Sequence, residues 1–147
     1  MEWLNKLQGK IIGLDTAPLI YFIEESPSYL EVTDAFFTAI YRGEFSVVTS
    51  VLTISEVLVY PLRAGNTILA QQYRDILFNS QGLTTIEVLP DIAENAARLR
   101  ADYNLRTPDA IQMSTAIYGG ASFFLTNDIR LPSLPGLTVL VLNQLIS

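Results

Sequence analysis

The 147-residue sequence contains no cysteine and no histidine. Without cysteine the chain has no disulfide framework and no thiolate metal site. Without histidine it has no Ser-His-Asp triad, no Cys-His pair and no histidine-ligated zinc. Any catalysis must therefore use carboxylates, hydroxyls, lysine, arginine or a bound hard metal ion.

Charged residues are also scarce, at 16% of the chain against a usual quarter. A surface with so few charges keeps some apolar area, which favours a protein partner or a homodimer. The net charge of −6 argues against a general nucleic-acid-binding surface, which is usually basic. It does not exclude a nucleic acid acted on at a metal site, because bound divalent cations invert the local field.

No apolar run approaches the roughly 20 residues of a membrane span, and Met1–Gly9 lacks the apolar core of a signal peptide. We therefore expect a cytoplasmic protein without a membrane segment. The length suits one domain, residues 1–147, with residues 1–9 as an N-terminal extension. Trp3, Leu4 and Leu7 in this extension form one apolar face of a helical turn, which indicates either an interface or a docked or frayed terminus.

Short apolar runs alternate with segments of helical periodicity. The expected strands are Lys10–Asp15, Phe45–Thr49, Leu83–Leu89, Ser122–Thr126 and Leu137–Leu142. The expected helices run from about Pro18 to Glu25, Tyr29–Tyr41, Ser50 to about Tyr60, Asn66–Asn79, Pro90–Tyr103 and from a Thr107 cap to Gly119. This pattern predicts a three-layer α/β/α fold around a central, mainly parallel sheet of about five strands.

Four carboxylates stand at junctions between these elements. Asp15 ends the first strand, Asp128 follows the fourth, Asp109 lies in the first turn of a helix, and Glu56 lies in the helix after the second strand. Each of the three aspartates also has a purely structural interpretation. Asp15 could be a helix cap, Asp109 could compensate the helix dipole, and Asp128 could be a turn residue. Because function gathers at the carboxyl ends of parallel strands, the set together predicts one acidic site.

Glu56 is the most informative of the four acids. Its helical neighbours are Leu52, Thr53, Val59 and Tyr60, so we expect it on a largely apolar face where a carboxylate needs a partner or a metal. The alternative is a capping box with Thr53. Ser50, a cap candidate earlier in the chain, makes that alternative less attractive.

Four converging carboxylates repel one another unless a cation lies between them. Ligation by oxygen alone favours Mg²⁺ or Mn²⁺ over zinc. With no histidine available, metal-assisted phosphodiester hydrolysis fits this set of residues.

The order of four short motifs resembles the PIN-domain family, in particular VapC-type toxin ribonucleases. The motifs are LDT (Leu14–Thr16), SEV (Ser55–Val57), TPDAI (Thr107–Ile111) and LTND (Leu125–Asp128), and Tyr103–Ala116 is the most similar stretch. The resemblance extends from Lys10 to Leu142. It implies a parallel sheet flanked by helices and metal-dependent cleavage of RNA that leaves 5′-phosphate and 3′-hydroxyl ends.

The resemblance also implies roles for individual residues. Asp15 and Asp109 would be direct metal ligands, and Glu56 and Asp128 would complete the cluster directly or through water. Thr16 and Thr126 would brace these acids, with Asn127 behind them. It further implies a homodimer and an antitoxin protein whose tail blocks the site.

The basic residues nearest the motifs are the candidates for RNA phosphate contact, with idle surface arginine as the alternative. They are Arg63, Arg106 and Arg130.

Two other functions compete with a nuclease. One is a non-catalytic PIN-like module that binds protein or RNA, which the complete acid set argues against. The other is a receiver-like phosphoacceptor, which requires an acidic pair after the first strand and a lysine near the last one. Asp15 stands alone there and no lysine follows Lys10, so this second alternative is disfavoured.

Overall fold

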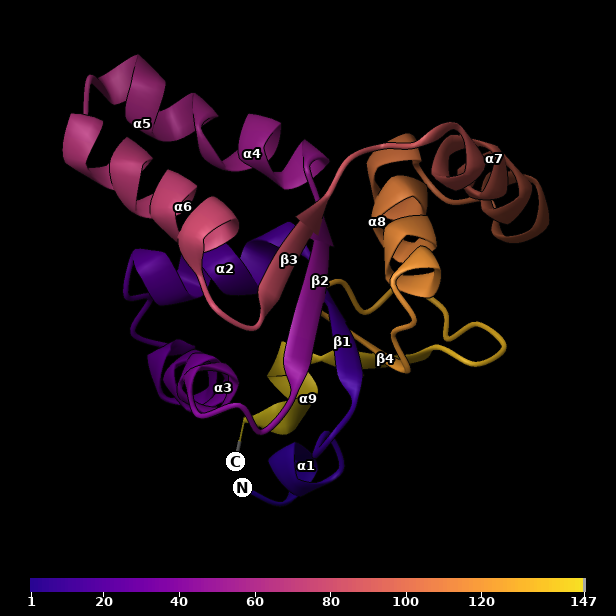
Figure 1. The fold of residues 1–147 in the computed structure, drawn as a ribbon, viewed down its shortest axis with the longest axis horizontal. Helices are drawn as coiled ribbons and strands as arrows, with labels where there is room; N and C mark the ends of the chain where they lie inside the picture. Colours follow the sequence, from indigo (N-terminus) through magenta and orange to yellow (C-terminus); the bar gives the residue numbers. More distant parts are fainter. Residues whose placement is uncertain (147) are drawn as a thin grey trace.

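The computed structural model describes residues 1–146 and contains one five-stranded sheet in which all pairings are parallel (Figure 1). The strands are β1 (Ile11–Leu14), β2 (Ser46–Ser50), β3 (Leu83–Ile86), β4 (Phe123–Thr126) and β5 (Thr138–Val141). Their order across the sheet is β3-β2-β1-β4-β5. The predicted fold class, a parallel sheet of about five strands, is confirmed.

Helices cover both faces of the sheet. The described residues form α1 (Glu2–Asn5), α2 (Thr16–Ile23), α3 (Leu30–Tyr41), α4 (Leu52–Val57), α5 (Val59–Ala64), α6 (Thr67–Asn79), α7 (Pro90–Tyr103), α8 (Thr107–Tyr118) and α9 (Leu142–Leu145). Figure 1 shows α2 to α6 on one side of the sheet and α7 and α8 on the other, with α1 and α9 near the two termini. The three layers of the prediction are therefore present.

Each face of the sheet has its own hydrophobic core, because successive strand residues point to opposite faces. Val47 and Leu125 pack with α2, α3 and α6, whereas Val48 and Phe124 pack with α7 and α8. All four side chains are buried. Burial on both faces explains why the strands read as continuous apolar runs.

Helix α8 lies unusually close to the sheet at Gly13. A Cβ atom built on Gly13 would lie 2.4 Å from the Cβ of Ala116 and 2.9 Å from the Phe124 ring. The absence of a side chain at Gly13 therefore allows α8 to approach β1, and α8 carries Asp109 at its first turn.

The N-terminal extension docks on the larger core. Leu7 is completely buried, and the Trp3 ring stacks on Phe36 with centroids 6.3 Å apart. Of the two interpretations of this segment, a docked terminus describes residues 1–9 of this chain.

Three local predictions were wrong. The helix expected from Ser50 to Tyr60 is two helices that meet at Leu58, because Pro61 has no N–H to donate to the carbonyl four residues earlier. The strand expected to reach Leu89 ends at Ile86. Thr107 is not a cap: Arg106 occupies the cap position of α8 without a side-chain hydrogen bond, and Thr107 is already helical.

Among the helices formed by residues 1–146, none combines the length and the apolar character needed to span a membrane.

Candidate active site

A cleft of about 530 Å³ opens at the carboxyl ends of β1 and β4. These strands are neighbours at the centre of the sheet, and the chain leaves β1 toward β2 but returns to β4 on the other side. Such a reversal point is the usual ligand site of open parallel sheets. The cleft is lined by Asp15, Thr16, Ala17, Ile20, Tyr21, Glu56, Arg106, Asp109, Thr126, Asn127, Asp128, Ile129 and Arg130.

Asp15 lies at the floor of this cleft, where β1 passes into α2. It is the N-cap of α2, and its Oδ1 accepts the backbone N–H of Thr16 at 2.8 Å. Its Oδ2 accepts the hydroxyl of Thr126 at 2.7 Å. Asp15 is thus a helix cap, as the structural interpretation predicted. Its carboxylate also lies in the cleft with the other three acids.

Burial raises the pKa of Asp15 above its ordinary value, and the negative charges of Asp109 and Glu56 raise it further. The hydrogen bonds from Thr126 and from the Thr16 backbone act in the opposite direction and stabilise the charged form. Asp15, Glu56 and Asp109 line the same cleft, and the charges of the latter two act on Asp15.

Thr126 connects two of the acids. Its hydroxyl donates to Asp15 and accepts the backbone N–H of Asp128 at 3.0 Å. Thr16 also contacts one of the acids, because its hydroxyl donates to Glu56 Oε1 at 2.7 Å. The two threonines tie α2, α4 and the end of β4 into one acidic site.

Glu56 lies in the cleft, but the expectation that it faces burial was wrong. Its side chain is exposed, and its helical neighbours Val59 and Tyr60 are about half and three-fifths exposed. The break between α4 and α5 removes the continuous apolar face that the sequence suggested. Glu56 forms no capping box with Thr53 either, because its bond goes to Thr16 while Thr53 accepts from Gln112.

The remaining two acids are paired with arginines at the rim. Arg106 Nε lies 3.2 Å from Asp109 Oδ2. Arg130 binds both carboxylate oxygens of Asp128, at 3.0 and 2.9 Å, and this pairing lowers the pKa of Asp128. Both arginine side chains are largely exposed, so the ion pairs stand at the solvent side of the cleft.

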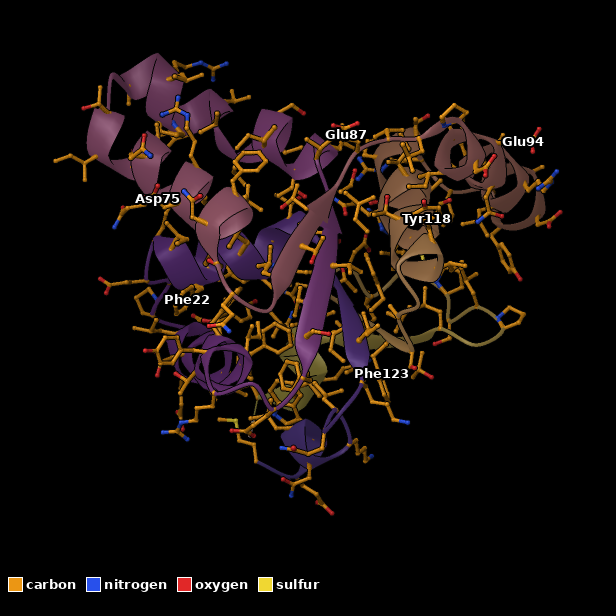
Figure 2. All side chains as sticks on the ribbon, in the orientation of Figure 1. Phe22, Asp75, Glu87, Glu94, Tyr118 and Phe123 are labelled. Atoms are coloured by element: carbon orange, nitrogen blue, oxygen red, sulfur yellow. The ribbon has the colours of Figure 1, made fainter. Side chains whose placement is uncertain are left out.

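Arg63, the third predicted phosphate contact, is not among the residues of the cleft. It lies exposed in the last turn of α5. Carboxylates elsewhere, such as Asp75 on α6 and Glu94 on α7, lie on the outside of the molecule away from the sheet ends (Figure 2).

The chemistry of these side chains fits a hard divalent cation. All candidate metal ligands are oxygen atoms. Burial and, to a smaller extent, the charges of Asp109 and Glu56 raise the pKa of Asp15, and a cation would relieve the repulsion among these charges. As the side chains stand, no three acids in residues 1–146 form a group that could hold a metal ion. Two of the four acids, Asp109 and Asp128, are paired with Arg106 and Arg130.

Sequence reasoning missed two contributors to the site. Gln112 on α8 is buried, donates to Thr53 of α4 at 2.7 Å and accepts from Ser50 N at 3.2 Å, so it fixes the helices that carry Asp109 and Glu56. The sequence around Gln112 gave no clear signal, because Ser114 and Thr115 are also buried polar residues of α8. Tyr21 lines the cleft, and its position in a short apolar helix gave no such signal.

Comparison with known proteins agrees with this architecture. The family model described as the PIN domain matches residues 12–137. A comparison with curated protein sequences gave no match.

Solved structures share the fold. The VapBC2 complex of Rickettsia felis bound to a DNA fragment from its promoter has a TM-score of 0.69 at 18% identity, covering 89% of this chain and 98% of that one. A toxin–antitoxin complex from Klebsiella pneumoniae has a TM-score of 0.66 at 24% identity, covering 88% and 96%. Mycobacterium tuberculosis VapC20, a toxin that cleaves the sarcin–ricin loop, has a TM-score of 0.63 at 15% identity, covering 78% and 86%.

Proposed function

This chain belongs to the PIN-domain family, and from that premise we propose that it is a metal-dependent endoribonuclease that hydrolyses RNA phosphodiester bonds. The observation that carries the proposal is the gathering of Asp15, Glu56, Asp109 and Asp128 in one cleft at the reversal point of the sheet.

We assign Asp15 and Asp109 as direct ligands of Mg²⁺ or Mn²⁺, with Glu56 and Asp128 completing the shell directly or through water. When bound, such a cation supplies charge neutralisation at the phosphoryl group and activation of a water. Thr126 and Thr16 position Asp15 and Glu56 by donating hydroxyl hydrogen bonds of 2.7 Å each. Arg106 and Arg130 then supply positive charge at the mouth of an otherwise acidic cleft, where an RNA phosphate would enter.

The structural likeness to toxin–antitoxin complexes supports a finer proposal: the chain is the toxin of such a pair in the cytoplasm, is inhibited by a cognate antitoxin, and forms a homodimer. Apolar residues exposed on α5 and α6 offer surface for such contacts. Val59, Leu62 and Ile68 are 48%, 61% and 76% exposed.

The test is cleavage of a mixed pool of structured RNAs by the parent protein and by Asp15→Asn, with Mg²⁺ or Mn²⁺ and then with EDTA. We expect cutting that requires the metal and is lost in the variant. Full activity of Asp15→Asn would overturn the assignment.

A non-catalytic PIN-like binding module remains the competing function. The pairing of Asp109 and Asp128 with arginines favours it, because it neutralises those acids without a metal. Titration with Mn²⁺ separates the two: absence of Mn²⁺ binding, together with absence of cutting, would favour the binding module.

A further inference from the structure

The amide of Asn127 lies at the centre of a polar network beside the acids. Asn127 follows β4 and stands between Thr126 and Asp128. Its Nδ2 donates to the hydroxyls of Tyr21 at 3.3 Å and Tyr29 at 3.1 Å, and its Oδ1 accepts the backbone N–H of Asn143 at 3.0 Å. Both amide hydrogens and the amide oxygen are therefore used, which fixes the orientation of the side chain.

The two tyrosine hydroxyls in this network differ in one respect. Tyr29 accepts from Asn127 and donates to Asn143 Oδ1 at 2.7 Å, so its proton is used inside the protein. Tyr21 accepts from Asn127, but no acceptor in residues 1–146 receives its proton. A phenol has one hydrogen to give, and at the partly exposed Tyr21 that hydrogen is available to water or to a molecule bound in the cleft.

The position of Tyr21 is fixed as well. Its ring stacks on that of Tyr29 with centroids 4.2 Å apart and an interplanar angle of 11°. The residue lines the cleft together with Asp15, Asp128 and Arg130. A rigid donor with an occupied acceptor side thus stands within the proposed active site.

We propose that the Tyr21 hydroxyl donates a hydrogen bond to a non-bridging phosphate oxygen of the bound RNA, and that Asn127 is the positioning residue that holds it. The inference rests on the nuclease function proposed above and names a substrate contact for it. A phosphate is the partner that fits, because it offers only acceptors and Arg106 and Arg130 border the same cleft. The Tyr21 hydroxyl is neutral, so it can contact a phosphate without forming an ion pair with the acids of the cleft, as Arg106 and Arg130 do.

The test measures RNA binding apart from cleavage. A short fluorescein-labelled single-stranded RNA of mixed sequence is titrated with Asp15→Asn protein in Mg²⁺, so that the RNA stays intact, and Tyr21→Phe is added to that background. We expect affinity to fall about 10-fold, as for loss of one hydrogen bond to a charged group, with little change in the midpoint of thermal unfolding. Tyr41→Phe is the matched control, because Tyr41 is 87% exposed and is not a residue of the cleft.

Two further measurements separate a positioned contact from a structural effect. Asn127→Ala should weaken RNA binding alone but add little in the presence of Tyr21→Phe, since both changes act on one hydroxyl. An abasic oligonucleotide of the same length should show the same loss with Tyr21→Phe, because it keeps every phosphate.

Each outcome bears on the inference. Unchanged RNA affinity of the Tyr21→Phe protein would overturn it while leaving the nuclease function intact, since metal-dependent cutting by the parent is measured separately. A loss confined to RNA that carries bases would overturn the phosphate assignment. Absence of both RNA binding and cutting would overturn the inference and the proposed function together.

Discussion

The hydroxyl of Thr126 at the end of β4 donates to Oδ2 of Asp15 at the end of β1, 2.7 Å away and 111 residues earlier in the chain. The Thr126 hydroxyl oxygen also accepts the backbone N–H of Asp128 at 3.0 Å. One small side chain thus contacts both Asp15 and the loop that carries Asp128. The Thr126 side chain is itself completely buried, so water does not readily replace its two bonds.

Thr126→Val removes these two bonds at almost constant volume. We expect the free energy of unfolding to fall by about 1–3 kcal/mol, since a buried acceptor loses its donor, and RNA cleavage to fall with it. Denaturant unfolding measures the first effect. Thr84→Val is the control, because Thr84 is exposed on β3, and equal costs for the two variants would contradict the role assigned to Thr126.

Asp15→Asn should change how the stability of the metal-free protein depends on pH. The folded-state pKa of Asp15 is raised by burial, so the folded protein keeps a proton that the unfolded chain has lost. Stability from this group therefore falls as pH rises through the window between the ordinary value of 3.8 and the raised one. The Asp15→Asn protein has no carboxyl group at this position, so its stability does not fall in this pH window for this reason.

The measurement is the midpoint of thermal unfolding against pH in EDTA for both proteins. The midpoint of Asp15→Asn relative to that of the parent should be highest near neutral pH and should fall in acid. Mg²⁺ should raise the midpoint of the parent but not that of the variant. The same pH dependence of the midpoint in both proteins would contradict the assigned environment of Asp15.

Glu56→Gln should separate activity from stability. Glu56 is exposed, so the free energy of unfolding should change by less than about 0.5 kcal/mol, while cleavage should fall about 10- to 100-fold if Glu56 completes the metal shell. Glu87→Gln serves as the control, since Glu87 is exposed near the end of β3 and does not line the cleft (Figure 2). Equal activity of the two variants would remove Glu56 from the site.

The sheet and the two strand-end acids, Asp15 and Asp128, could be predicted because each has a local signature. Apolar runs mark strands that are buried on both faces, and an acid directly after such a run falls at the sheet's carboxyl edge. The exposure of Glu56 could not be predicted, because it depends on where α4 ends, and Pro61 ends it earlier than the apolar pattern suggests. The roles of Gln112 and Tyr21 depend on partners 59 and 106 residues away, and no short-range pattern encodes such pairs.

Gly13→Ala should displace α8. The new Cβ would lie 2.4 Å from Ala116 Cβ, so we expect a loss of at least about 1–3 kcal/mol from overpacking and reduced cleavage, because α8 carries Asp109. Adding Ala116→Gly removes the nearest clashing atom and should recover part of the loss, as a thermodynamic cycle measures. Strictly additive effects of the two changes would show that this contact does not set the distance between helix and sheet.

Arg130→Gln should act oppositely on the metal and on RNA. Arg130 holds both oxygens of Asp128 at 3.0 and 2.9 Å, and while it does so that carboxylate is not available to a cation. Removing the guanidinium should therefore raise the affinity for Mn²⁺ several-fold, measured by titration of the protein with the ion alone. It should also weaken binding of a single-stranded RNA and flatten its salt dependence, because one positive charge is lost from the cleft. Arg63→Gln, outside the cleft, should change neither affinity, and weaker Mn²⁺ binding by Arg130→Gln would show that Arg130 supports the acid site instead of competing for it.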